Sequence, residues 1–134
     1  MSEVKEVTYE VALRALNDAV AMRGPGYVDP GSITGSCANV TRDEDGMWVP
    51  SCIVGTALTL LGVEAAWLGA WCEADSFEAT YEVLAGDGLM TMTDDAYWLF
   101  VTAQGNQDHA TSWGEAVVMA HLGPLGAPLT AGRS

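Results

Sequence analysis

The stretch "VPSCIVGTALTLLG", residues 49–62, is apolar at almost every position between its cysteine and its closing glycine. Pro50 stops the preceding extended run, Ser51 can cap a helix, and Gly62 is a natural helix end. Apolar residues occupy every face of the helix expected at 52–61, and a helix that is apolar all round is a buried one. Each buried aliphatic side chain contributes about 1.5–3 kcal/mol. This helix is therefore expected to form the centre of the core.

Amphipathic helices are expected on both sides of this central helix. "TYEVALRALNDAVAMR", 8–23, carries apolar residues at helical spacing behind a Thr8 cap, and a Gly-Pro-Gly turn at 24–26 ends it. Four further helical segments are expected, the last three behind capping side chains: 63–75, 77–86 (Ser76), 94–109 (Thr93) and 113–122 (Ser112 with Glu115).

One β-hairpin is expected at 36–49, ahead of the central helix. The runs "CANVT" and "MWV" have a strand-like composition, and the Asp45-Gly46 pair between them is a strong tight-turn dipeptide. The alternation in "GDGLMTM", 86–92, leaves room for a further short strand.

Length and composition indicate one globular domain. The chain has 134 residues, of which 49% are hydrophobic. We expect an α+β fold, mainly helical: a single domain of five or six helices around a buried central helix, with one small β-hairpin, over 1–123. A flexible C-terminal tail is expected at 124–134. No apolar run reaches the roughly 18–20 residues of a membrane span, and the N-terminus lacks signal-peptide features, so a cytoplasmic protein is expected.

The carboxylates are distributed unevenly along the chain. The net charge is −13, and residues 43–132 contain thirteen Asp or Glu but no Lys or Arg. Carboxylates without cationic neighbours must stay solvated and repel one another. This charge disfavours nucleic acid as a partner, because binding it depends on cations, and it favours a basic protein. Mimicry of DNA by the carboxylates is a less favoured interpretation, because apolar residues interrupt the acidic positions.

The cysteines predict neither a disulfide framework nor a metal site. Cys37, Cys52 and Cys72 are an odd number, and no CxxC or HxxxH spacing occurs. No cofactor is expected. Cys37 and Cys52 flank the expected hairpin and can approach each other, which in a reducing compartment indicates packing first and redox sensing second.

Cys52 is the sharpest candidate for chemistry. A cysteine in the first turn of a helix gains thiolate character from the helix dipole. His109 or His121 is the candidate base of a cysteine hydrolase, with Asp108 or Asn106 to orient it. However, the apolar neighbours and the negative field both raise a thiol pKa. A cysteine in such a segment is usually a small buried core residue, so packing is the preferred interpretation.

The stretch "AQGNQDHATSW", 103–113, is the most polar patch of the chain's helical part. Gln104, Gln107 and Asp108 share one helical face. These groups are candidates to line a small-molecule pocket in which Trp113 stacks on a flat ligand. The preferred alternative is that they satisfy backbone groups at a helix end, while Trp113 packs into the core.

An aromatic ridge is expected at Trp67, Leu68 and Trp71. The two tryptophans are one helical turn apart, and five tryptophans are more than a core of this size usually hides. If exposed, the ridge is an interface for a protein partner or for self-association, since aromatic residues dominate binding hot spots. The alternative is ordinary core packing.

Two stretches carry a family resemblance: "SCANVTRDEDGMWVPSCIVGTALTLLG", 36–62, and "AQGNQDHATSWGEAVVMA", 103–120. The chain resembles a group of small uncharacterised proteins encoded by actinobacteriophages and some of their hosts. That group shares a cysteine before a hairpin, a "PSCIVG"-like helix start and an "AQ..QD....W.EA"-like stretch. The resemblance implies no catalytic residue. It implies a phage accessory protein in the cytoplasm of a bacterial host cell, and such proteins often act by binding a host protein.

The expected function is therefore that of a non-enzymatic phage accessory protein. It would bind a host protein through its acidic surface and an aromatic patch. A binder of a small molecule, either a nucleotide or a metabolite, is the alternative, and a cysteine hydrolase that uses Cys52 and His109 is less favoured. Neither nucleic acid nor a membrane is expected as a partner.

Repulsion between the unneutralised carboxylates makes a prediction about salt. The melting temperature should be higher in about 0.5 M than in about 0.02 M sodium chloride, because ions screen the repulsion. Thermal unfolding followed by circular dichroism measures both values. A lower melting temperature in the high-salt buffer would contradict the proposed charge distribution.

Overall fold

The computed structural model describes residues 5–31, 38–73, 76–109 and 111–122. Six helices are described: α1 (Tyr9–Arg23), α3 (Ile53–Leu60), α4 (Ala65–Trp71), α5 (Phe77–Gly86), α6 (Asp94–Asp108) and α7 (Trp113–Leu122). Four short strands form two separate pairs: β1 (Lys5–Val7) with β4 (Met90–Met92), and β2 (Val40–Arg42) with β3 (Trp48–Pro50). The fold is α+β and mainly helical, as the sequence predicts.

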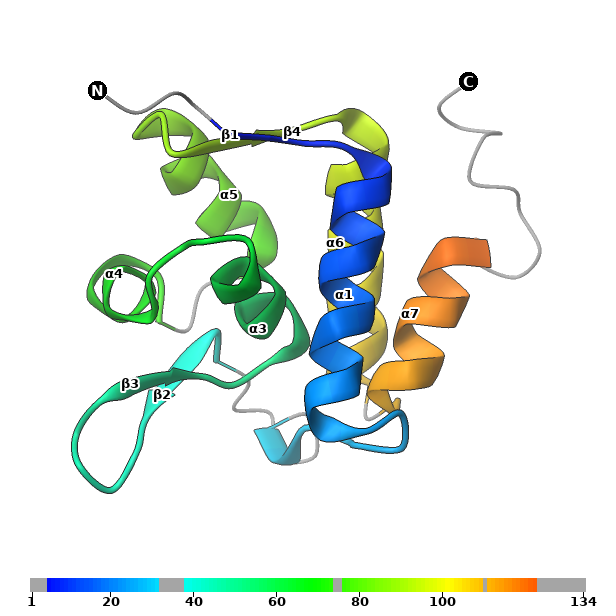
Figure 1. Cartoon of the computed structure of the whole chain (residues 1–134), viewed down its shortest axis with the longest axis horizontal. Helices are drawn as coiled ribbons and strands as arrows, with labels where there is room; N and C mark the ends of the chain where they lie inside the picture. Colours follow the sequence, from blue (N-terminus) through cyan, green and yellow to red (C-terminus); the bar gives the residue numbers. More distant parts are fainter. Residues whose placement is uncertain (1–4, 32–37, 74–75, 110, 123–134) are drawn as a thin grey trace.

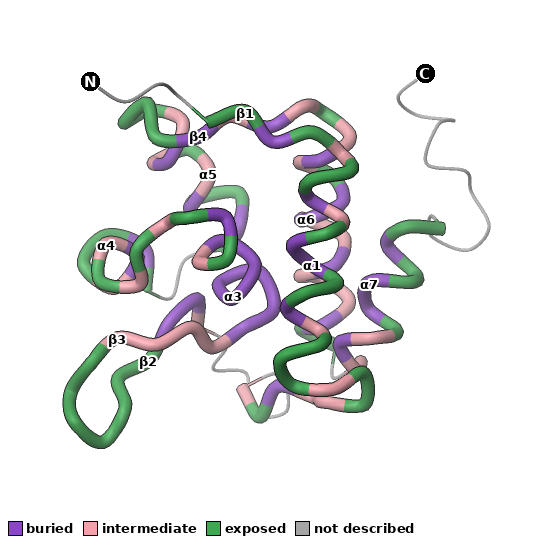
Figure 2. The backbone as a smooth tube through the Cα atoms, in the orientation of Figure 1, coloured by how far each residue is buried: buried purple, intermediate pink, exposed green. Residues whose placement is uncertain are grey.

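Helix α3 lies in the middle of the molecule, as its apolar sequence predicts (Figures 1 and 2). Residues 53–58 are all buried, and α1, α4 and α6 contact the helix. Helices α1, α6 and α7 form a neighbouring group on one side of the molecule. Leu60 differs from the expectation and is 45% exposed. It lies in the last turn of α3, and only the earlier turns are enclosed.

Three of the expected helix caps are confirmed. The hydroxyls of Thr8 and Ser76 accept hydrogen bonds from the backbone N–H three residues on, at 3.5 and 3.1 Å. Ser112 does the same for Glu115 N at 3.4 Å and donates to the Glu115 carboxylate at 3.1 Å. These side chains satisfy N–H groups that have no partner inside the helix.

The caps of α3 and α6 differ from the expectation. Cys52, rather than Ser51, occupies the N-cap of α3, and its Sγ accepts a hydrogen bond from Gly55 N at 3.2 Å. Ser51 still belongs to the extended segment, where its N–H pairs with the start of the hairpin. Thr93 holds the N-cap position of α6, but its hydroxyl donates to the Asp95 carboxylate at 2.6 Å rather than accepting from the helix.

The hairpin predicted before α3 is present as the antiparallel pair of β2 and β3. The Asp43 carboxylate accepts two backbone N–H groups of the turn, at 2.9 and 3.0 Å, and Gly46 adopts a φ of 78°. The Arg42 guanidinium lies 4.3 Å from the centroid of the Trp48 ring. The same ring packs on Gly69 of α4, where a Cβ would come within 2.3 Å of the indole. The missing side chain at Gly69 therefore lets the hairpin dock on α4.

The parallel pair of β1 and β4 is a feature that the sequence did not predict as a pair. Strand β1 aligns Lys5 with Met90 and Val7 with Met92. Val7 and Met90 are both buried, so this pair closes one end of the core (Figure 1). A strand of three residues is too short to produce a recognisable alternation, and its partner strand lies 85 positions further along the chain.

Two expectations fall outside the described residues, namely those for Cys37 and for the tail at 124–134. Within the described ranges, no helix has both the length and the apolar character needed to cross a membrane.

The backbone of the hairpin approaches α3 closely at Gly55. A Cβ on this residue would come within 1.9 Å of the backbone oxygen of Asn39 and 2.6 Å of its carbonyl carbon. Both residues are buried, so neither backbone has open space into which to move. Only glycine fits at this point of α3.

Substitution of Gly55 by alanine is expected to lower the free energy of unfolding by about 3 kcal/mol or more, because the methyl group overlaps the backbone of Asn39. Urea denaturation measures the difference. Gly105→Ala in α6 is the matched control, since a Cβ there meets nothing within 4 Å. That control should leave stability unchanged or raise it by about 0.5–1 kcal/mol. Equal stability of the Gly55 variant and the natural chain would contradict the close packing.

Candidate functional site

The sequence-predicted polar residues meet at the N-terminus of α3. Cys52 caps this helix and is buried. Its thiol donates to the side-chain oxygen of Asn39 at 3.5 Å while the sulfur accepts from Gly55 N at 3.2 Å. Its carbonyl accepts from both the N–H and the hydroxyl of Thr56, at 2.9 and 2.8 Å. Cys52 is thus bonded to its own helix and to the hairpin.

Asn39 joins the hairpin to two other elements through buried hydrogen bonds. Its side-chain nitrogen donates to the carbonyl of Cys72 at 2.8 Å and to the Thr80 hydroxyl at 2.9 Å. Its backbone N–H donates to the carbonyl of Glu73 at 2.7 Å. This residue therefore ties β2, the end of α4 and α5 to the thiol of Cys52.

The two glutamines of α6 complete the cap of α3. Gln107 is buried, and its side-chain oxygen accepts from Ile53 N at 3.0 Å. The side-chain oxygen of Gln104 accepts from Val54 N at 3.4 Å. These are N–H groups of the first turn, which have no partner within α3. This geometry matches the preferred interpretation of the polar patch as a partner for a helix end.

Asp108 fixes the orientation of both glutamines. Its Oδ1 accepts from the side-chain nitrogens of Gln104 and Gln107, each at 2.9 Å. The amide oxygens are therefore turned toward α3. The Asp108 carboxylate lies behind the two amide groups, near the positive end of the α3 dipole. The amide groups on this face of α6 are therefore hydrogen-bonded within the protein.

A cleft of about 440 Å³, named here the α3 cleft, opens beside this network. Its polar lining includes Asn39, Cys52, Gln104 and Asp108, and Phe77 lies on its apolar wall. Glu78 adds a second exposed carboxylate to the lining. Two of the four predicted ligand-binding residues, Gln104 and Asp108, therefore line one cavity.

Burial controls the acidity of the Cys52 thiol. Desolvation raises its pKa to about 12, and the nearby carboxylates of Asp29 and Asp108 act in the same direction. The Gly55 N–H opposes this shift but is outweighed. The helix dipole is therefore insufficient to ionise this thiol, and a protonated thiol is a poor nucleophile.

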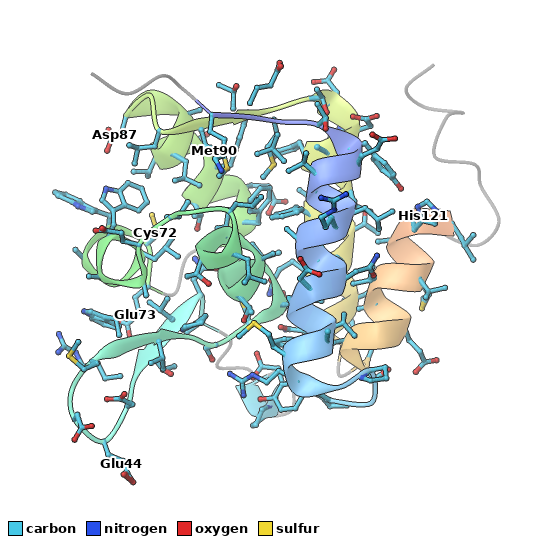
Figure 3. The ribbon with its side chains drawn as sticks, in the orientation of Figure 1. Glu44, Cys72, Glu73, Asp87, Met90 and His121 are labelled. Carbon is cyan, nitrogen blue, oxygen red and sulfur yellow. The ribbon has the colours of Figure 1, made fainter. Side chains whose placement is uncertain are left out.

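The two histidines lie apart from the thiol's hydrogen bonds. The Nδ1 of His109 lies 2.7 Å from the carbonyl of Gly105 in its own helix. His121 lies on α7, and its Nδ1 is 2.7 Å from the Tyr9 hydroxyl of α1 (Figure 3). In the described part of the chain, neither imidazole is hydrogen-bonded to Cys52. The candidate nucleophile and the candidate bases are therefore not hydrogen-bonded to one another among the described residues.

Trp113 is fully buried, and its ring lies outside the α3 cleft. It packs edge-on against Tyr27 at a centroid distance of 4.9 Å, and the Arg23 guanidinium lies 5.8 Å from its centroid. Its indole N–H has no hydrogen-bond partner among the described residues. Core packing therefore accounts for the position of Trp113.

The expected aromatic ridge on α4 is only partly on the surface. Leu68 is wholly buried and contributes nothing to it. Trp71 is 66% exposed. Trp67 is half-buried and lines a cleft of about 370 Å³ with Lys5 and Glu64. Any contact of this ridge with a partner must depend on Trp71 and the outer edge of Trp67.

A third cleft, of about 390 Å³, was not selected from the sequence. We name it the tyrosine–tryptophan cleft, and it lies where α5, β4 and α6 meet. Its described lining is Glu78, Tyr81, Glu82, Met92, Asp94, Tyr97 and Trp98. Both helices carry an acidic side chain three positions before a tyrosine, and this spacing places the two on one helical face. This repeated spacing of an acidic residue and a tyrosine is the sequence pattern that could have indicated the cleft.

Neither a metal cluster nor a known relative adds to this geometry. Among the described residues, no three His, Cys, Asp or Glu side chains gather closely enough to hold a metal ion. No protein-family model, no curated protein and no solved structure matches this chain.

The raised pKa of Cys52 makes a prediction about thiol labelling. At pH 8, an unperturbed thiol of pKa about 8.5 is roughly one quarter thiolate, whereas a pKa of about 12 leaves roughly one part in ten thousand. N-ethylmaleimide should therefore modify Cys52 on the order of a thousandfold more slowly in the folded protein than in the urea-unfolded chain. Peptide mass spectrometry separates this label from the other cysteines. If folded Cys52 were labelled as fast as in the unfolded chain, the raised pKa would be contradicted and Cys52 would again be a candidate nucleophile.

Proposed function

We propose that this protein is a non-enzymatic binding protein whose partner is a basic protein. The observation that carries the proposal is the position of the acidic side chains. Twelve Asp or Glu are described after Arg42, and all are exposed except Asp95, which is half-buried. No described Lys or Arg follows Arg42. This part of the molecule presents negative charge to solvent, which attracts and orients a positively charged partner.

Two of the described arginines contact neutral groups. Arg42 donates to the carbonyl of Gly46 at 3.0 Å and stacks on Trp48. Arg23 stacks on Tyr27, with 5.0 Å between the guanidinium carbon and the ring centroid, and donates to the carbonyl of Pro50 at 3.3 Å. In these contacts neither guanidinium group is paired with a carboxylate of the acidic surface.

The α3 network favours neither cysteine catalysis nor the binding of a small molecule. The pKa of the Cys52 thiol is raised by burial, and the His109 imidazole is bonded to its own helix. The side-chain oxygens of Gln104 and Gln107 are bonded to backbone N–H groups of α3. A small molecule in the α3 cleft would compete with these bonds, and a nucleotide phosphate would face the carboxylates of Glu78 and Asp108.

Exposed aromatic side chains can supply the affinity that charge alone does not. Trp71 on α4 is 66% exposed and Trp98 on α6 is 48% exposed. Large aromatic rings bury apolar area at low conformational cost and dominate binding hot spots. On the resemblance to actinobacteriophage proteins, we propose that the partner belongs to the bacterial host. Self-association through the same rings is a further outcome that the experiment below distinguishes.

Affinity purification from an actinobacterial lysate tests the proposal. The full-length chain on a resin should retain a basic protein in about 0.05 M sodium chloride, and the purified pair should bind at least about tenfold more weakly in 0.5 M. A polyglutamate resin controls for simple cation exchange, and gel filtration of the chain alone detects self-association.

Two results would overturn this function. One is retention only of proteins that the polyglutamate resin also retains. The other is a retained partner whose affinity does not change with salt. Thermal-shift measurements with nucleotides and common metabolites address the alternative, which predicts a clear rise in melting temperature with one of them.

A further inference from the structure

The walls of the tyrosine–tryptophan cleft are aromatic rings held at defined angles. The Tyr81 and Tyr97 centroids are 5.1 Å apart with 55° between the ring planes, and Tyr97 meets Trp98 edge-on at 5.2 Å. The Tyr81 hydroxyl accepts from Met92 N at 2.8 Å, which fixes this ring against β4. Trp98 is 48% exposed, so part of its ring remains open to solvent.

Carboxylates surround these rings. Glu78 and Glu82 lie one turn apart on α5, Asp94 is the first residue of α6, and all three are exposed. Burial and the negative charges of Glu78 and Glu82 raise the pKa of the Tyr97 hydroxyl. The three exposed carboxylates make the potential inside the cleft negative. Aromatic faces are also negative, so rings and carboxylates favour the same charge on a ligand.

No cation lies among the described residues that line this cleft. Elsewhere the chain fills comparable positions from within, since Arg42 stacks on Trp48 at 4.3 Å and Arg23 stacks on Tyr27 at 5.0 Å. In the tyrosine–tryptophan cleft the rings and carboxylates are present without such a side chain. The described lining of the cleft therefore leaves these rings and carboxylates available to a cation from another molecule.

We propose that the tyrosine–tryptophan cleft is the docking site for an arginine side chain in a basic segment of the partner protein, an inference that rests on the proposed function. A guanidinium group is planar, stacks on tyrosine and tryptophan, and pairs with carboxylates through two parallel hydrogen bonds. A lysine ammonium is a compact, strongly hydrated charge and uses only part of this arrangement. The cleft thus selects arginine over lysine, which simple charge attraction does not.

Peptide binding to the full-length chain tests this assignment. Hexa-arginine and hexa-lysine carry equal charge, and titration of each in about 0.15 M sodium chloride compares the two side chains. The indole N–H resonance of Trp98, assigned with Trp98→Phe, reports binding at the cleft by NMR. Hexa-arginine should shift this resonance and bind at least about fivefold more tightly than hexa-lysine.

Two pairs of variants place the binding in the cleft. Trp98→Ala should weaken hexa-arginine binding about fivefold, whereas Met22→Ala, which removes an exposed apolar side chain of α1 (58% exposed), should leave it unchanged. Glu82→Gln should weaken binding about threefold. Glu44→Gln removes the same charge at the tip of the hairpin, outside the lining of the cleft, and should weaken binding less than Glu82→Gln does (Figure 3). Circular dichroism confirms that each variant is folded.

The outcomes separate this inference from the function on which it rests. Equal affinity for the two peptides, or equal loss of affinity in each cleft variant and its control, would overturn the cleft assignment and leave the acidic binding protein in place. Absence of binding by both peptides, together with an empty lysate capture, would overturn both.

Discussion

The structure depends on how the N-terminus of α3 is satisfied inside the core. A buried helix end carries N–H groups that cost free energy unless they find partners. Here the partners come from the helix itself, through the sulfur of Cys52, and from α6, through Gln107 and Gln104. Asp108 orients both amides from behind. This network fixes α6 against α3, and the position of α6 in turn places Tyr97 and Trp98 in the tyrosine–tryptophan cleft.

The same network decides the role of Cys52. Its place at the start of a helix suggests an activated thiol, but activation requires water or a cation to stabilise the thiolate. Burial and two nearby carboxylates act in the opposite direction and raise the pKa. The sulfur instead accepts a backbone hydrogen bond and donates to Asn39, which connects the hairpin, α4 and α5. Cys52 therefore serves packing and helix capping.

The proposed binding function depends on the side chains that the core leaves in solvent. The amphipathic helices enclose α3, and the described carboxylates that follow Arg42, apart from the half-buried Asp95, remain in solvent. A surface with one sign of charge provides long-range attraction but little selectivity. Selectivity requires a shaped site, and the rings of Tyr97 and Trp98 next to Glu82 form one. The two proposals thus assign attraction to the whole acidic surface and recognition to one cleft.

The sequence by itself determined the helices, the hairpin turn, the buried α3 and the solvated carboxylates, because apolar periodicity, capping residues and net charge are local properties. It also narrowed the polar patch on α6 to two interpretations. Only the tertiary structure showed that this patch caps the start of α3, because the bond from Ile53 N to Gln107 joins residues 54 positions apart. The parallel pairing of β1 with β4, the burial of Leu68 and the tyrosine–tryptophan cleft likewise depend on how distant elements pack. No local pattern encodes that packing, since the same helical face can meet either solvent or another helix.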